Sequence, residues 1–91
     1  RVEELVVRAS LALGITDGPT KGDVVMTAEG PKMIELAARL SGGDFCESLV
    51  PLGTGVNYVE TAIRIAIGEK PDLAALVPTR SRCVANRYFF T

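Results

Sequence analysis

The 91-residue sequence contains no histidine and no tryptophan, and it has only two cysteines. Without histidine, no Ser-His or Cys-His nucleophile can operate. Cys46 and Cys83 are far apart and form no C-x-x-C pair, which argues against a zinc site and favours reduced thiols in a cytoplasmic protein. Any chemistry in this chain therefore depends on carboxylates, arginine, lysine, backbone donors and a metal ion.

The sequence also has no large excess of charge of either sign and no long hydrophobic run. The net charge is −1, and without a basic run we expect no nucleic-acid partner. No apolar run approaches the length of a membrane span, and the first residues show no signal-peptide pattern. The hydrophobic content of 47% suits a single small globular domain over residues 1–91 with a modest core.

The spacing of apolar residues and the turn signals predict an α+β fold. We expect a helix over Glu3 to Leu13 followed by Gly14, and then a β-hairpin. A short helix should begin at Asp44 and end at Pro51, with residues 52–55 as a loop. A better marked helix should begin at the N-cap Asn57 and stop at Gly68. One or two helical turns over residues 72–77 and a final strand over residues 83–90 complete the prediction, so that hairpin and terminal strand form a small antiparallel sheet.

The hairpin carries the most informative pattern. Two short alternating runs flank the turn signal of residues 28–31. Asp23 lies six residues before Glu29 and Glu35 lies six residues after it, so the two carboxylates should face each other across the ladder. Opposed like charges destabilise a sheet unless something compensates them, and Mg²⁺ or Mn²⁺ prefers oxygen ligands. The alternative is that both carboxylates are ordinary solvated strand residues in a register shifted by one or two positions.

Side-chain alternation divides the hairpin into two expected faces. The even-numbered face is apolar and should pack on the core; it consists of Val24, Met26, Ile34, Leu36 and Ala38. The odd-numbered face carries Asp23, Thr27, Glu35 and Arg39, with Val25, Met33 and Ala37 between them. Lys21 shares this second face if the strand begins early enough, where it would either reach a phosphate or remain a solvated lysine.

These residues resemble the metal-binding strands of ATP-grasp ligases, of the carbamoyl-phosphate synthase large-chain and ATP-dependent amino-acid ligase type. The family pattern is similar to I-E-x-x-x-R-x-x-G, which Ile34-Glu35, Arg39 and the following Leu40-Ser-Gly-Gly43 match. The likeness runs from residues 12–19 to residues 68–71. One departure is Ala37, where many members carry a further metal-binding Asn.

The resemblance implies a function and a set of roles. The chain would be the C-terminal half of an ATP-grasp domain, in an enzyme that uses ATP and Mg²⁺ (or Mn²⁺) to activate a carboxylate or bicarbonate and transfer it to an amine. Asp23 and Glu35 would hold the metal and, through it, the ATP phosphates. Arg39 would bind phosphate or acyl-phosphate oxygens as a catalytic and substrate-binding group, and Gly42 would contact the acceptor substrate.

The chain begins at Arg1 and ends in Phe-Phe-Thr, from which we expect a piece of a longer enzyme. Its partners would then be the remainder of the ATP-grasp chain, ATP and a small carboxylate or amine substrate. The piece alone should be inactive and should self-associate, either through residues 83–90 or through the surface that the missing half would cover. The alternative is a non-enzymatic α+β module whose hairpin face binds a partner protein, with the carboxylates as solvated charges. Arg39 likewise has an alternative role, as a charge partner that neutralises Glu35.

Overall fold

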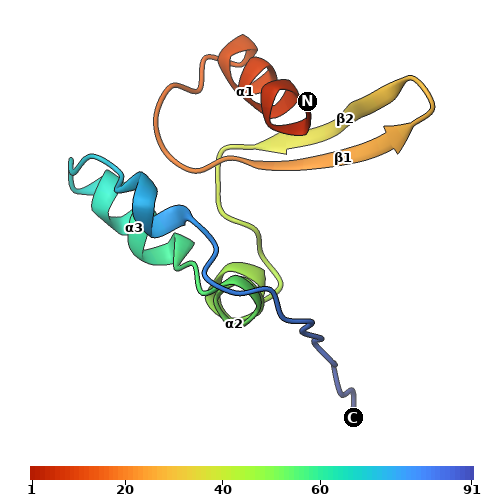
Figure 1. The fold of residues 1–91 in the computed structure, drawn as a ribbon, viewed down its shortest axis with the longest axis vertical. Helices are drawn as coiled ribbons and strands as arrows, with labels where there is room; N and C mark the ends of the chain where they lie inside the picture. The colour runs from red at the N-terminus through yellow and green to blue at the C-terminus, as the bar shows by residue number, and fades with distance from the viewer. The chain divides into compact units, whose positions relative to one another are not determined.

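An amphipathic helix and a β-hairpin make up the first of two units in the computed structural model, which describes residues 1–91 (Figure 1). This unit covers residues 1–40 and contains α1 (Val2–Ala12), β1 (Lys21–Thr27) and β2 (Gly30–Ala37). Residues 41–91 form the second unit, and each unit is described by itself. The protein is an α+β structure whose sheet has two antiparallel strands.

Helix α1 forms where the sequence predicts it. Its half-buried residues Leu5, Val6 and Ala9 lie on one stripe. Ser10 is buried, and its hydroxyl is satisfied because it donates to the carbonyl of Val6 at 2.8 Å. Gly14 has a φ of 74°, as expected for the glycine that follows a helix.

The hairpin contains a β-bulge that the sequence pattern did not reveal. A two-residue turn at residues 28 and 29 pairs Thr27 with Gly30, and this register continues to Val24 opposite Met33. The register then shifts by one, so that Asp23 pairs with Glu35 and Ile34 has no partner. The predicted opposition of Asp23 and Glu35 is therefore confirmed. The expected turn centre at Glu29 is wrong, because the turn centres between residues 28 and 29.

The turn register and the bulge together decide which side chains of β2 face the helix. A Cβ placed on Gly22 would lie 3.4 Å from Val6 and 3.6 Å from Met33, so Met33 shares the face that packs on α1. Ile34 is 69% exposed, contrary to the prediction that the even-numbered side chains of the hairpin face the core. Leu36 and Val24 are half-buried, as predicted.

Two further members of the predicted apolar face are also exposed. Met26 lies near the turn, at the other end of β1 from Gly22, where α1 packs. Ala38 lies beyond the end of β2. The apolar face is therefore shorter than the alternation of residue types predicts.

The second unit begins with a helix that runs through a proline. The π-helical segment η1 (Phe45–Leu49) continues directly into α2 (Val50–Thr54), so Pro51 does not end the helix and residues 52–54 are not a loop. Pro51 lies in the first turn of α2, where its fixed φ is compatible with a helix. Asp44 precedes η1 with a φ of 66°, but its carboxylate accepts from the Ser48 hydroxyl and caps no backbone N–H.

Helix α3 (Tyr58–Ala66) and the 3-10 segment η2 (Leu73–Leu76) agree with the sequence prediction. Asn57 caps α3 by accepting from the Glu60 N–H at 3.0 Å. Asp72 caps η2 by accepting from the Ala74 N–H at 3.0 Å. Gly68 follows α3 with a φ of 90°. The apolar side chains of α3 are only partly covered, since Val59 is half-buried whereas Ile63 is exposed.

The predicted final strand over residues 83–90 is absent. The chain there is extended coil, and the side chains of Phe89 and Phe90 are 92% and 91% exposed. A strand needs a ladder partner for its backbone groups, and these residues have none in the structure. The segment just before it is held on α2, where the Arg82 N–H donates to the Gly53 carbonyl at 2.9 Å.

The buried residues of the second unit gather at η1 and α2. Cys46 and Val56 are buried, and so is Gly53, whose Cβ position lies 3.1 Å from Val84. None of the helices has the length and apolar composition needed to cross a bilayer.

We expect the register of the hairpin to be visible in stability measurements. Met33→Thr should lower the free energy of unfolding by about 1–2 kcal/mol, because it removes apolar surface packed on the hairpin face that meets α1. Ile34→Thr should change it by less than about 0.5 kcal/mol, because the side chain is exposed and the β-branch is kept. Urea unfolding of both variants checks this. A larger loss at Ile34 than at Met33 would show that the straight alternation, and not the bulged register, describes β2.

Candidate functional site

The two hairpin carboxylates share one positive charge. Asp23 and Glu35 are ladder partners, and Lys21 lies two residues before Asp23 on the same face of β1. The Lys21 ammonium forms an ion pair with Asp23 Oδ2 and lies 3.8 Å from Glu35 Oε1. A cation of the chain itself thus lies at both carboxylates, and it compensates the like charges that the sequence pattern places opposite each other.

The carboxylates are open to solvent, and the lysine is less so. The side chains of Asp23 and Glu35 are 50% and 59% exposed, whereas that of Lys21 is 23% exposed. The stem of Lys21 therefore lies along the hairpin while its head meets the carboxylates. No third Asp, Glu, Cys or His joins them to form a group of metal ligands. The donor set that the chain offers here is two carboxylates in direct opposition.

Arg39 lies outside the ladder. Strand β2 ends at Ala37, and the Arg39 guanidinium donates from Nη1 to the carbonyl of Leu40 at 3.1 Å. It forms no ion pair, and the charge partner of Glu35 is Lys21. The alternative in which Arg39 neutralises Glu35 is therefore wrong.

Gly42 belongs to the second unit, in the turn that precedes η1. Its carbonyl accepts from the Phe45 N–H at 3.3 Å, and the space where a Cβ would lie is open. Its role as a substrate contact stays a prediction, as do the ligand roles of Asp23 and Glu35.

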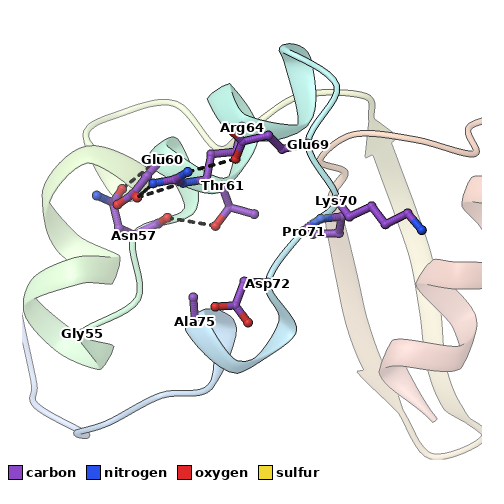
Figure 2. A pocket seen from close by; sticks show the side chains of 10 residues that line it. All are labelled: Gly55, Asn57, Glu60, Thr61, Arg64, Glu69, Lys70, Pro71, Asp72 and Ala75. Atoms are coloured by element: carbon purple, nitrogen blue, oxygen red, sulfur yellow. Dashed lines mark hydrogen bonds and ion pairs between the residues drawn. The ribbon is translucent and has the colours of Figure 1, made fainter.

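The second unit also contains a polar pocket that sequence reasoning missed. It has a volume of about 420 Å³ and lies beside α3 and η2 (Figure 2). It is lined by Gly55, Asn57, Glu60, Thr61, Arg64, Glu69, Lys70, Pro71, Asp72 and Ala75. Figure 2 shows the side chain of Lys70 pointing away from the other labelled side chains.

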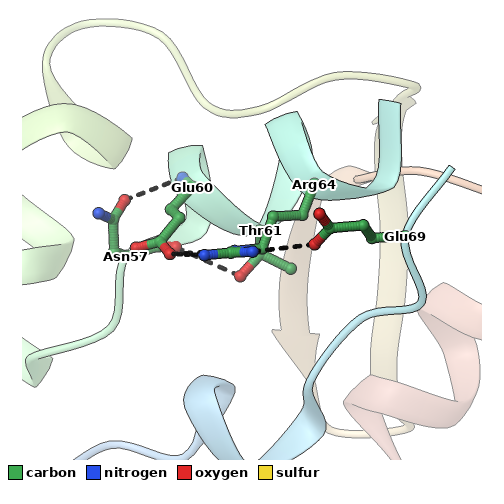
Figure 3. Close-up of polar contacts among 5 residues, drawn as sticks. All are labelled: Asn57, Glu60, Thr61, Arg64 and Glu69. Atoms are coloured by element: carbon green, nitrogen blue, oxygen red, sulfur yellow. Dashed lines mark hydrogen bonds and ion pairs between the residues drawn. The ribbon is translucent and has the colours of Figure 1, made fainter. Parts of the chain in front are cut away.

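Arg64 is the organising residue of this pocket. Its Nε and Nη2 donate to Glu60 Oε1 at 3.0 and 2.9 Å, and its Nη1 donates to Glu69 Oε2 at 2.9 Å (Figure 3). Glu69, and then Glu60, raise the pKa of Arg64 above its ordinary value by hydrogen bonding and by charge. Because three of its donors already bind carboxylates, Arg64 organises the pocket wall and is poorly suited to binding an anion. The i, i+4 spacing of Glu60 and Arg64 on a helix was the available sequence signal.

Comparisons with known proteins give one relative and no family. No protein-family model matches this chain, and no solved structure matches it. The sequence is 36% identical over 74 residues to a protein of Sinorhizobium fredii (strain NBRC 101917 / NGR234) named "Uncharacterized protein y4rH". The match covers 81% of this chain and spans 15% of the length of that relative.

We expect Glu35→Gln to leave the fold intact. In the absence of metal, the change removes one exposed partner of Lys21 and also one of two opposed negative charges, so the free energy of unfolding should change by less than about 1 kcal/mol. Chemical unfolding in buffer with a chelator measures it. A loss of several kcal/mol would mean that the Lys21–Glu35 contact holds the hairpin together.

Proposed function

We propose that this chain supplies the metal-binding hairpin of an ATP-dependent carboxylate–amine ligase of the ATP-grasp type. The observation that carries the proposal is the direct opposition of Asp23 and Glu35 in the ladder. Two carboxylates on adjacent rigid strands hold a divalent ion more precisely than loop residues do. The pattern Ile34-Glu35 with Arg39 four residues on is the second support.

The donor set fits Mg²⁺ or Mn²⁺. Both ions prefer carboxylate oxygens and keep other positions for water and phosphate, and both carboxylates are open to solvent. A positive charge already lies at the pair in the form of Lys21. When bound, ATP would supply the phosphoryl group that activates the carboxylate substrate, and the metal would draw charge from the phosphates.

Arg39 would act on the substrate side of this reaction. Its guanidinium is charged at all physiological pH values and binds an oxyanion through two parallel N–H donors. It makes no ion pair within the chain, and it follows directly on β2. We assign it to phosphate or acyl-phosphate oxygens, and we assign Gly42 to the acceptor substrate. The full-length protein would provide the rest of the nucleotide site.

One observation favours a second candidate, a non-enzymatic module that binds a partner protein. Tyr88, Phe89 and Phe90 are consecutive, aromatic and exposed. An unpaired apolar segment readily adds to the edge of another sheet. In that case Lys21 simply neutralises the hairpin carboxylates, and the protein has no need of a metal.

The first test compares metal binding and turnover in the full-length protein. We expect Mg²⁺ or Mn²⁺ to raise the melting temperature, since a ligand at 100 times its Kd stabilises a fold by about 2.7 kcal/mol. Glu35→Gln should abolish this rise and lower kcat by about 100-fold or more, because a charge that stabilises the transferring phosphate is lost.

Glu29→Gln is the matched control, since Glu29 is an exposed carboxylate of the same hairpin that pairs only with Lys32. It should retain both the metal effect and the turnover. If metal leaves the melting temperature of the parent protein unchanged and Glu35→Gln turns over normally, the hairpin is not a metal site and the module reading is favoured.

The second test concerns Arg39. Arg39→Lys should lower turnover by about tenfold or more, because an ammonium cannot reproduce a two-pronged contact whose charged hydrogen bonds each contribute about 1.5 to 3 kcal/mol. Arg8→Lys, on the exposed side of α1, should have no effect in the same steady-state assay. Full activity of Arg39→Lys would exclude a bidentate role.

A further inference from the structure

Lys21 occupies the position that a divalent ion would need. Its ammonium contacts Asp23 and lies 3.8 Å from Glu35, so it is shared by the two opposed carboxylates. The other lysine of the hairpin, Lys32, is bound elsewhere, since it pairs only with Glu29. The hairpin therefore has one lysine at the candidate site and one comparable lysine away from it.

An ammonium and a divalent ion cannot share this pair without cost. A metal that binds both carboxylates replaces the contact of Lys21 with Asp23, and it brings two positive charges next to a third. Free Mg²⁺ or Mn²⁺ gives the displaced ammonium no new partner. A metal that carries a polyphosphate gives the ammonium a new partner, because the phosphate oxygens arrive with the ion and accept charged hydrogen bonds. The flexible four-carbon stem of lysine allows its head to move from carboxylate to phosphate.

We propose that Lys21 and the divalent cation are alternative occupants of the Asp23–Glu35 pair, and that Lys21 makes the site select a metal–polyphosphate complex over the free ion. The inference rests on the proposed function, because it requires that the carboxylate pair holds a metal. It adds that Lys21 determines which ligand the bound metal must carry, namely a polyphosphate. Lys21 is on this account a specificity residue that exchanges one anionic partner for another.

The test measures Mn²⁺ binding to the full-length protein by electron paramagnetic resonance, with Mn²⁺ alone and with Mn²⁺ bound to a non-hydrolysable ATP analogue. Lys21→Met keeps an unbranched side chain as far as Cε and removes the charged amine. It should bind free Mn²⁺ about tenfold more tightly, since the competing cation is gone. Its preference for the nucleotide complex over the free ion should fall by a similar factor.

Lys32→Met is the matched control and should bind both forms as the parent protein does. Circular dichroism of both variants establishes that they are folded. If Lys21→Met binds free Mn²⁺ no more tightly than the parent, while Glu35→Gln abolishes binding, the inference is wrong and the proposed metal site stands. If neither the parent protein nor any variant binds Mn²⁺ in either form, the proposed function and the inference both fail.

Discussion

The register of the β-hairpin is the constraint on which the candidate site depends. The two-residue turn alone would place Ile34 opposite Asp23 and would leave Glu35 on the other face of the sheet. One unpaired residue in β2 shifts the register so that Asp23 meets Glu35. The turn register already places Met33 opposite Val24, on the side that packs on α1, and leaves Ile34 exposed. The bulge then places Leu36 opposite Gly22 on that side while Glu35 meets Asp23. Turn register and bulge together therefore set the packing on the helix and the opposition of the carboxylates.

The opposed carboxylates then create an electrostatic requirement. Two negative side chains in direct opposition destabilise a ladder unless a positive charge lies at them. Lys21 meets this requirement from within the chain. A hairpin neutralised in this way folds without metal, and a metal-binding role would make its neutralising charge exchangeable. Folding and the proposed binding thus compete for the same two side chains.

The second unit is organised by backbone groups at helix ends. Asn57 and Asp72 satisfy N–H groups at the starts of α3 and η2. Two carbonyl groups of α2 accept hydrogen bonds from further along the chain. The Arg80 side chain donates to the carbonyls of Pro51 and Leu52 at 2.6 and 3.1 Å. A basic side chain at a helix C-terminus is also favoured by the helix dipole. These contacts hold residues 79–82 against α2 although few side chains there are buried.

Much of this structure follows from local sequence signals. The helix of residues 2–12, the hairpin, the Asn57 cap and the glycine that ends α3 are set by propensity, capping and turn chemistry, all of which act within a few residues. The opposition of Asp23 and Glu35 was also predicted from the sequence. It is correct because an assumed turn centre and an unseen bulge give the same register at that point. Further toward the turn, the two registers differ by one residue.

Other features depended on contacts that no short segment contains. Alternation could not show that Met33 is inside and Ile34 outside, since the two are equally apolar and only packing on α1 distinguishes them. The apolar residues 83–90 have strand composition, but a strand exists only where another strand pairs with it. The sequence by itself determined where α1 and α3 form and which two carboxylates oppose each other. Tertiary structure alone decided which side of the hairpin is packed and that Lys21 is the cation between the carboxylates, because both depend on the positions of atoms that the register brings together.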